Sequence, residues 1–370
     1  MFDHTKSYSY DNKQQMQESC IMKKRFLAAA IATGLAATTM TAQAEVKVKW
    51  FGFAQITASA VSEDDPNDGI VFGADRVRFG FKVKDGKFFA KLQADLNRNH
   101  NSNPKNGTLP EIIKDIVVGW KWSDAAKISL GQFKTPVGMD FNTSGKKLDI
   151  TKRGMEKPLV LERGVGAMIS GRKIGGGFGY DVFYGNPVGR SAADPAAATG
   201  SETTTALNVR YDMGKMMHVE LGYGLAETSA TGPGTDDYTV VDFGFRFKSG
   251  PSTAKFEWID GTSVGGVDGT DETVWFAHYG HMLNKSTELV VRYYAGSSSV
   301  TGNPDTDLNN TFLGVNFFTG SNKTNGRIQV NYVLAGGDDQ NGTSNPTGTA
   351  YTGLGGFTDD AILTQYQVSF

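Results

Sequence analysis

Apolar and polar residues alternate along most of this chain, and its last ten residues show the pattern most clearly. Ile362, Thr364, Tyr366, Val368 and Phe370 fall on one face of an extended strand. The intervening residues, which are mostly polar, fall on the other face. A period of two with one apolar and one polar face predicts a strand between two different environments. A strand of this kind that ends at a terminal Phe is typical of a membrane-spanning barrel, with lipid outside and water inside.

The same alternation recurs in sixteen runs, each close to the length that a tilted strand needs to cross a bilayer. The runs cover about residues 46–60, 71–84, 87–98, 111–122, 126–134, 163–173, 177–186, 202–213, 216–227, 237–248, 252–262, 272–283, 286–297, 308–318, 326–335 and 359–370. An even number of strands places both termini on the same side of the membrane.

The connections between these runs alternate between short and long. The short ones have tight-turn compositions and lie at 85–86, 123–125, 175–176, 214–215, 249–251 and 284–285, with a longer seventh at 319–325. The long, polar ones lie at 61–70, 99–110, 135–162, 187–201, 228–236, 263–271, 298–307 and 336–358. Short periplasmic turns and long external loops are typical of bacterial outer-membrane barrels. We therefore predict an all-β fold, a 16-stranded antiparallel transmembrane β-barrel. A soluble all-β protein would also alternate, but its strands are usually only about five or six residues long.

The N-terminal part of the chain has the features of a secretory leader. A basic start at 23–25 precedes an apolar run at 26–37 and a small-x-small cleavage site at 42–44. We predict an N-terminal extension at 1–21, a signal peptide at 22–44 and the barrel at 45–370. A mis-called start codon would explain the extension; the alternative is a genuine extra segment. The one cysteine, Cys20, precedes the leader, so the exported chain has no disulfide. No apolar run is long enough for a membrane-spanning helix.

The longest connection without strand character, 135–162, follows the fifth run. A loop of this length indicates a function, and we predict that it folds into the lumen and narrows it. From Lys134 to Arg163 the chain carries seven basic and four acidic residues. The basic ones are the predicted constriction residues: Lys134, Lys146, Lys147, Lys152, Arg153, Lys157 and Arg163. Basic groups at a narrow point favour anions.

Basic residues also occur on the polar faces of the strands. We place Arg76, Arg78, Lys82, Lys91, Arg172, Arg210, Arg246, Lys255, Arg292 and Arg327 on the lumen wall. Acidic residues share these faces, namely Asp95, Asp115, Asp181, Glu220, Asp242, Glu257 and Glu288. An alternative is therefore that the charges pair, or that they set a transverse field across the constriction. The net charge is −2, and about −4 without the leader, which argues against a nucleic-acid partner.

The segment 131–138, Gly-Gln-Phe-Lys-Thr-Pro-Val-Gly, ends the fifth run and opens the long loop. It resembles the G-Q-F-K-x-P-hydrophobic-small signature of the phosphate-selective porin O and P family. The resemblance implies a sixteen-stranded trimeric porin with its third loop inside the lumen. In some members of that family an arginine ladder leads to a lysine-rich constriction.

The favoured hypothesis is a passive outer-membrane porin for small hydrophilic solutes and ions, with an anion preference as a refinement. The alternative is a solute-specific, phosphate-type anion channel with a saturable site. A third hypothesis, an adhesin or an enzyme, would need a closed lumen or a hydrolytic triad, and the sequence indicates neither. Expected partners are outer-membrane lipid, lipopolysaccharide and two further copies of the chain. No cofactor and no metal are expected, since His278 and His281, three residues apart on a strand, point to opposite faces.

Overall fold

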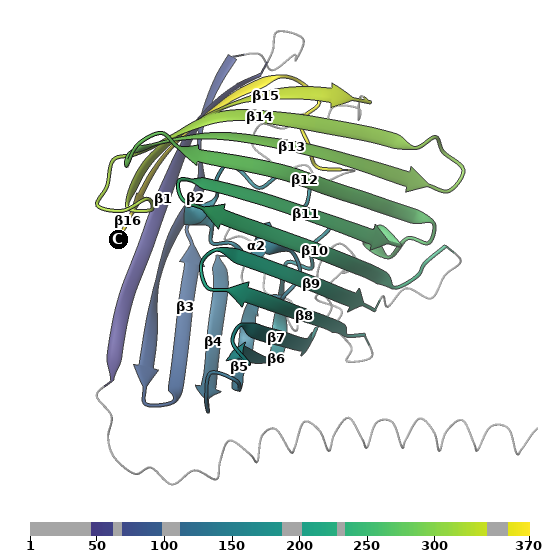
Figure 1. Ribbon diagram of the computed structural model, residues 1–370. Helices are drawn as coiled ribbons and strands as arrows, with labels where there is room; N and C mark the ends of the chain where they lie inside the picture. Colours follow the sequence, from purple (N-terminus) through teal and green to yellow (C-terminus); the bar gives the residue numbers. More distant parts are fainter. Residues whose placement is uncertain (1–45, 62–68, 98–111, 187–201, 228–233, 339–353) are drawn as a thin grey trace, which may run out of the picture. The chain divides into compact units, whose positions relative to one another are not determined.

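The computed structural model describes residues 46–61, 69–97, 112–186, 202–227, 234–338 and 354–370. Sixteen antiparallel strands in these residues form a closed barrel (Figure 1). They are β1 (Lys47–Val61), β2 (Gly69–Asp85), β3 (Phe88–Asp95), β4 (Ile113–Lys121), β5 (Lys127–Lys134), β6 (Arg163–Ile174), β7 (Phe178–Gly185), β8 (Thr204–Met213), β9 (Met217–Ala226), β10 (Tyr238–Ser249), β11 (Ser252–Thr262), β12 (Thr270–Met282), β13 (Thr287–Val300), β14 (Thr306–Phe318), β15 (Gly326–Gly337) and β16 (Ala361–Ser369). The predicted fold class is confirmed. The predicted extension at 1–21 and signal peptide at 22–44 lie outside the described residues.

Each strand pairs with its neighbours in sequence, and the first strand pairs with the last. β1 and β16 run antiparallel, from Phe53 opposite Ser369 to Val61 opposite Ala361. The seam gives both edge strands a partner, which a barrel surrounded by lipid requires. β1 begins and β16 ends near the short turns. The start of the first strand and the end of the last strand therefore lie at the same rim of the barrel, as predicted.

The apolar face of the strands is the outer one. On β16, the side chains of Ile362, Tyr366 and Val368 are 51%, 49% and 47% exposed. Gln365 and Gln367, on the opposite face, are completely buried. An outer wall of exposed apolar side chains is unfavourable in water and favourable in lipid. The faces predicted for this strand are therefore confirmed.

Aromatic side chains cluster near the short turns. Trp50 stacks on Phe79 with ring centroids 5.3 Å apart, and Phe178 lies 4.9 Å from Tyr211. Trp120 packs edge-on against Phe88. Tyrosine and tryptophan favour the boundary between lipid and water, so these rings are placed for an aromatic girdle at that rim.

Helical structure in the described residues is limited to three short elements. They are α2 (Met139–Asn142) and the 3₁₀ helices η1 (Gly145–Lys147) and η3 (Val264–Gly266). α2 and η1 belong to the long connection between β5 and β6. None of the helices in the described residues is long and apolar enough to cross a membrane.

The structure changes one predicted boundary substantially. The segment 298–307 was predicted to be a long loop, but β13 continues to Val300 and β14 begins at Thr306. Ser297 and Ser298 pair with Asp307 and Thr306, so polar residues extend this hairpin. Polarity alone suggested a loop there, whereas strand pairing beyond the membrane needs no apolar face. The predicted connections 99–110 and 187–201, and parts of those at 61–70, 228–236 and 336–358, lie outside the described residues.

The seam depends on a glycine that contacts the terminal aromatic residue. Gly52 and Phe370 exchange two backbone hydrogen bonds, at 3.4 and 3.1 Å. The Phe370 ring covers Gly52 so closely that a Cβ atom there would lie 2.6 Å from it. At Gly73, also in a strand, a Cβ atom would meet its nearest neighbour at an ordinary 3.6 Å.

We expect Gly52→Ala to displace the Phe370 ring and to lower the free energy of unfolding by about 1–2 kcal/mol, as overpacking does. Gly73→Ala is the matched control and should leave it almost unchanged. Urea unfolding of the refolded barrel, followed by tryptophan fluorescence, measures both. Equal effects of the two substitutions would contradict the account of the seam.

Candidate functional site

The loop 135–162 is held against the buried, polar face of the strands. The side-chain amide of Gln55 on β1 donates to the Gly145 carbonyl at 3.0 Å, and Arg327 on β15 donates to the Leu148 carbonyl at 2.7 Å. The carbonyl of Asp149 accepts a hydrogen bond of 3.0 Å from Asn316 on β14. These donors lie on the face opposite the exposed apolar side chains. The loop therefore packs on the inner wall, where Figure 1 also draws α2.

The start and the middle of the loop attach to different parts of this wall. Near its start, the backbone N–H groups of Gly138 and Asp140 donate to Asp242 on β10 and Glu257 on β11, at 3.2 and 2.8 Å. In its middle, Thr151 donates to the Asn331 side chain on β15 at 2.9 Å. Side-chain amides and carboxylates on the inner wall thus satisfy backbone groups of the loop that would otherwise lack partners.

Apolar packing accompanies these hydrogen bonds. Phe141, Ile150 and Leu161 of the loop are at most 2% exposed and belong to one core with Phe276 and Phe312 of the wall. The alternation of apolar and polar residues predicts a polar inner face and does not predict this core. A loop that covers part of the inner wall makes that part an interior, so apolar residues are favourable there.

Arg292 is the centre of the loop attachment. It lies on the inner wall as predicted, but its side chain is 0% exposed. Its guanidinium is 3.4 Å from Asp140 and 3.1 Å from Asp149, and it donates to the Tyr294 hydroxyl at 2.8 Å. It also lies over the Phe276 ring at 4.3 Å. A buried charge needs such partners, so Arg292 anchors the loop and does not face the lumen.

Lys255 reinforces the same anchor. Its amine pairs with Asp149 and lies 4.0 Å from Asp140. Although burial opposes ionisation, Lys255, His278 and Arg292 together hold the pKa of the Asp149 carboxyl well below its usual range. The two loop carboxylates are therefore neutralised by the wall.

Most of the predicted constriction residues have partners within the loop or on the wall. Lys134 and Arg153 both donate to the carbonyls of Phe141 and Thr143 and lie over the Phe141 ring. They stabilise the loop conformation, because these carbonyls lie at the end of α2 and, among the described residues, accept no hydrogen bond from a following helical turn.

The remaining predicted constriction residues differ in their partners. Lys152 lies 3.9 Å from Asp75, Lys157 lies 3.8 Å from Glu162, and Arg163 pairs with Asp115 at 2.8 Å. Lys146 and Lys147 belong to η1, where Lys147 is exposed and Lys146 is half-buried. Burial, followed by the charge of Lys147, lowers the pKa of Lys146.

The predicted lumen-wall arginines differ in their partners. Arg172 binds Asp181 through two hydrogen bonds of 2.9 and 2.8 Å, and Arg210 pairs with the same carboxylate. Arg327 is 3% exposed and, besides the Leu148 carbonyl, donates to Gln367 at 3.2 Å. Arg76 donates to Gln55 at 2.8 Å. Arg246 lies on the inner face, opposite Lys255 in the strand register.

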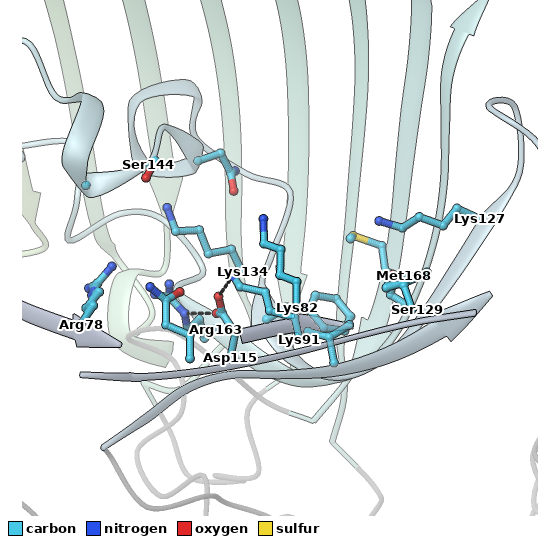
Figure 2. A pocket seen from close by; sticks show the side chains of 16 residues that line it. Arg78, Lys82, Lys91, Asp115, Lys127, Ser129, Lys134, Ser144, Arg163 and Met168 are labelled. Atoms are coloured by element: carbon cyan, nitrogen blue, oxygen red, sulfur yellow. Dashed lines mark hydrogen bonds and ion pairs between the residues drawn. The ribbon is translucent and has the colours of Figure 1, made fainter. Parts of the chain in front are cut away.

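A cavity of about 450 Å³ lies between the inner faces of β2 to β6 and the loop residues 142–145 (Figure 2). Six of the side chains that line it are basic and one is acidic. The basic ones are Arg78, Lys82, Lys91, Lys127, Lys134 and Arg163, and the acidic one is Asp115. Figure 2 shows Asp115 joined to two of its basic neighbours. These partners are Arg163 and Lys91, and Arg78 pairs with Asp95 at 2.9 Å.

Lys82 and Lys127 are the unpaired cations of this cavity, since neither makes an ion pair or a hydrogen bond with any residue that the structure describes, whereas Lys134 donates to two loop carbonyls. The sequence analysis predicted Lys82 but missed Lys127, which is the first residue of β5. Lys127 and Ser129 share the inner face of β5, so the alternation could have identified it. The predicted residues Arg78, Lys82, Lys91, Lys134 and Arg163 come together here, whereas Arg172, Arg210, Arg246, Arg292 and Arg327 do not line the cavity.

The carboxylates nearest the loop lie beneath it and away from this cavity. Asp242 and Glu257 are 0% and 1% exposed under the first turn of the loop. Glu156 is equally buried and lies near Asp140 and Arg292. Burial, followed by the charge of Asp140, raises the pKa of Glu156 to about 7, although Arg292 opposes the shift.

We expect the loop packing to weaken as the pH rises. Because the folded-state pKa of Glu156 is raised above its ordinary 4.5 to about 7, its stabilising contribution is complete below pH 4.5 and is lost as the pH rises through 7. The loss is on the order of 3 kcal/mol at most. The glutamine in Glu156→Gln has no charge at any pH. The urea concentration at the midpoint of unfolding should therefore fall less between pH 5 and pH 8.5 in this variant than in the wild type.

Glu162→Gln is the matched control, since Glu162 is an exposed carboxylate of the same loop. It should retain the wild-type pH dependence. A Glu156→Gln variant whose midpoint changes with pH as steeply as that of the wild type would contradict this role of Glu156.

Solved structures of other proteins share this fold. An anion-selective porin from Comamonas acidovorans superposes with a TM-score of 0.65 at 13% identity, over 88% of this chain and 100% of that one. OmpF of Salmonella typhi in complex with daunomycin gives 0.65 at 12% identity, over 89% and 100%. The trimer form of OmpT from Vibrio cholerae gives 0.60 at 14% identity, over 88% and 99%. At these identities the likeness establishes the fold alone.

Sequence comparison identifies the family. No curated protein matches the chain significantly. The family model described as phosphate-selective porin O and P matches residues 50–255, more than half of the 370 residues. The matched range includes the segment 131–138 and the loop 135–162, so the resemblance inferred from the sequence is confirmed, as is an outer-membrane location. The chain belongs to the phosphate-selective porin O and P family.

Proposed function

We propose that each barrel forms a water-filled channel through which small hydrophilic solutes and ions diffuse passively, with a preference for anions. The observation that carries the proposal is the cavity between the loop and β2 to β6, where six basic side chains face one carboxylate. Fixed charge at a narrow part of a pore favours mobile ions of the opposite sign. The anion-selective porin from Comamonas acidovorans, which has the same fold, supports this preference.

The loop 135–162 is the proposed constriction. Four lysine side chains on or beside the loop can contact solutes: Lys82 and Lys127 on the wall, and Lys146 and Lys147 on η1. Lys134, Arg153 and Arg163 keep the loop and the wall in place. Asp242 and Glu257 do not balance these charges in the lumen, because the loop covers them. The preference therefore depends on a few unpaired lysines within a wall of paired charges.

A solute-specific anion channel is the second candidate, and the excess of basic side chains in the same cavity favours it. A saturable site for a phosphate-type anion would use the unpaired Lys82 and Lys127. Millimolar phosphate would then reduce chloride current to a plateau, whereas a general porin would show a change proportional to ion concentration. Neither candidate requires a catalytic residue, a metal or a cofactor.

We also propose how the protein is placed in the membrane. Outer-membrane lipid and lipopolysaccharide contact the apolar outer wall, and the mature chain begins near Glu45 after removal of the signal peptide 22–44. Three copies assemble into a homotrimer, as OmpT of Vibrio cholerae does in its trimer form. Closed symmetry is usual for assemblies of identical chains.

The oligomeric state can be tested on protein extracted in mild detergent. We expect a protein mass of about three chains by light scattering coupled to size-exclusion chromatography. Boiling in dodecyl sulfate, which unfolds the barrel, should convert a slow electrophoretic band into the band of a single mature chain. A folded barrel with the mass of one chain would contradict the trimer and would leave the channel proposal intact.

Charge neutralisation tests the anion preference. In planar bilayers the protein should give stepwise conductances, and Lys82→Gln with Lys127→Gln should lower the anion-to-cation permeability ratio. Two unit charges about 7 Å from a passing ion stabilise an anion, and destabilise a cation, by about 1 kcal/mol in water. The difference of about 2 kcal/mol corresponds to about thirtyfold in this ratio before screening by salt. The control Lys215→Gln, in an exposed turn, should have no effect. Silent bilayers from a folded barrel would reject the channel, and an unchanged ratio in the double variant would reject the assignment to this cavity.

A further inference from the structure

The cavity next to the loop has an apolar part as well as a charged one. Phe89, Val117, Phe133 and Met168 line it on four consecutive strands. Val117 and Phe133 are buried and belong to the core of the wall, and Phe89 and Met168 are partly buried against that core. An aqueous lumen is usually lined by polar side chains. Hydration of ions therefore does not explain this apolar patch, which we call the apolar floor.

A glycine on a neighbouring strand leaves space for a ring of the apolar floor. A Cβ atom at Gly119, opposite Phe89 in the register, would lie 2.3 Å from the Phe89 ring. The glycine therefore allows this ring to lie against the strand. Phe133 is fixed from behind by Phe183, with the two rings edge-to-face at 5.7 Å. A flat, supported apolar surface results at the base of the cavity.

The two unpaired amines lie at the border of the apolar floor. The Lys127 amine is 5.0 Å from the centre of the Phe89 ring, and Ser129 pairs with Met168 in the strand register. In Figure 2, Lys127 lies beside Met168, and Lys82 lies between this pair and Arg163. The site therefore offers positive charge, a hydroxyl group and apolar surface within one cavity of about 450 Å³.

From this combination we infer that the cavity is a binding subsite for organic monoanions with a compact apolar body, such as aromatic carboxylates or sulfonates. The inference rests on the proposed function, since solutes reach the cavity through the channel. The anionic group binds Lys127, which lies over the Phe89 ring, with Lys82 adding positive charge to the same cavity, and the apolar body covers Phe89 and Met168. A bare inorganic anion gains nothing from the apolar floor, because only apolar surface profits from leaving water there. The volume lies in the range usual for small-molecule sites.

Isothermal titration calorimetry of the refolded protein in a nonionic detergent tests the inference without requiring conduction. The probes are benzoate, acetate, phosphate and benzyl alcohol. We expect benzoate to bind about tenfold more tightly than acetate or phosphate, because its ring adds buried apolar area, and benzyl alcohol to bind more weakly for lack of charge. Lys127→Gln and Met168→Gln should each reduce benzoate binding several-fold, with Lys215→Gln as the control.

Each outcome decides the matter. Equal affinities for benzoate and acetate would overturn the role of the apolar floor, whereas benzyl alcohol binding as tightly as benzoate would indicate partition into detergent and overturn the site. The wild-type series alone is decisive should a variant fail to fold. Silent bilayers together with the expected binding pattern would reject the channel and retain the subsite. Stepwise conductances together with equal affinities for benzoate and acetate would retain the channel and reject the subsite.

Discussion

Backbone amide and carbonyl groups in the lipid core have no water to bond with, and this constraint determines the architecture. Every strand must have a partner on both sides, so β1 and β16 meet in the seam from Phe53 to Val61. Once the barrel is closed, side chains alternate between lipid and the inner wall. The exposure of Ile362 and the burial of Gln365 on one strand follow from this geometry.

The inner wall also holds a long loop in place among charged side chains. Arg292 is the most demanding element, because a fully buried guanidinium is unfavourable unless carboxylates and hydrogen-bond acceptors surround it. Asp140 and Asp149 meet that need and are supplied by the loop itself. The same contacts bury the carboxylates of Asp242 and Glu257 beneath the loop. The loop therefore separates a neutralised side of the wall from a basic side at β2 to β6.

The fold was predictable from the sequence, because alternation, turn residues and strand length all follow from the same lipid constraint. All sixteen strands lie where the alternation places them, including β15, which begins at Gly326 after the longer turn at 319–325. Polar extensions such as Ser297 to Val300 were not predicted, since a strand outside lipid carries no apolar signal. The alternation assigns each charged residue to a face of its strand, but which of them pair depends on neighbouring strands and on the loop. Arg292 and Lys82 look alike in the sequence, yet one is buried among carboxylates and the other has no ion pair. The apolar core between loop and wall could not be predicted from single strands, because it exists only once the loop has covered the wall.

The central claim is that unpaired lysines beside the loop give the channel a preference for anions. The most direct measurement is the zero-current potential of the wild-type channel in a planar bilayer with a potassium chloride gradient. Anion preference drives chloride toward the dilute side and predicts that this side becomes negative. A potential of the opposite sign, with the dilute side positive, would contradict the account.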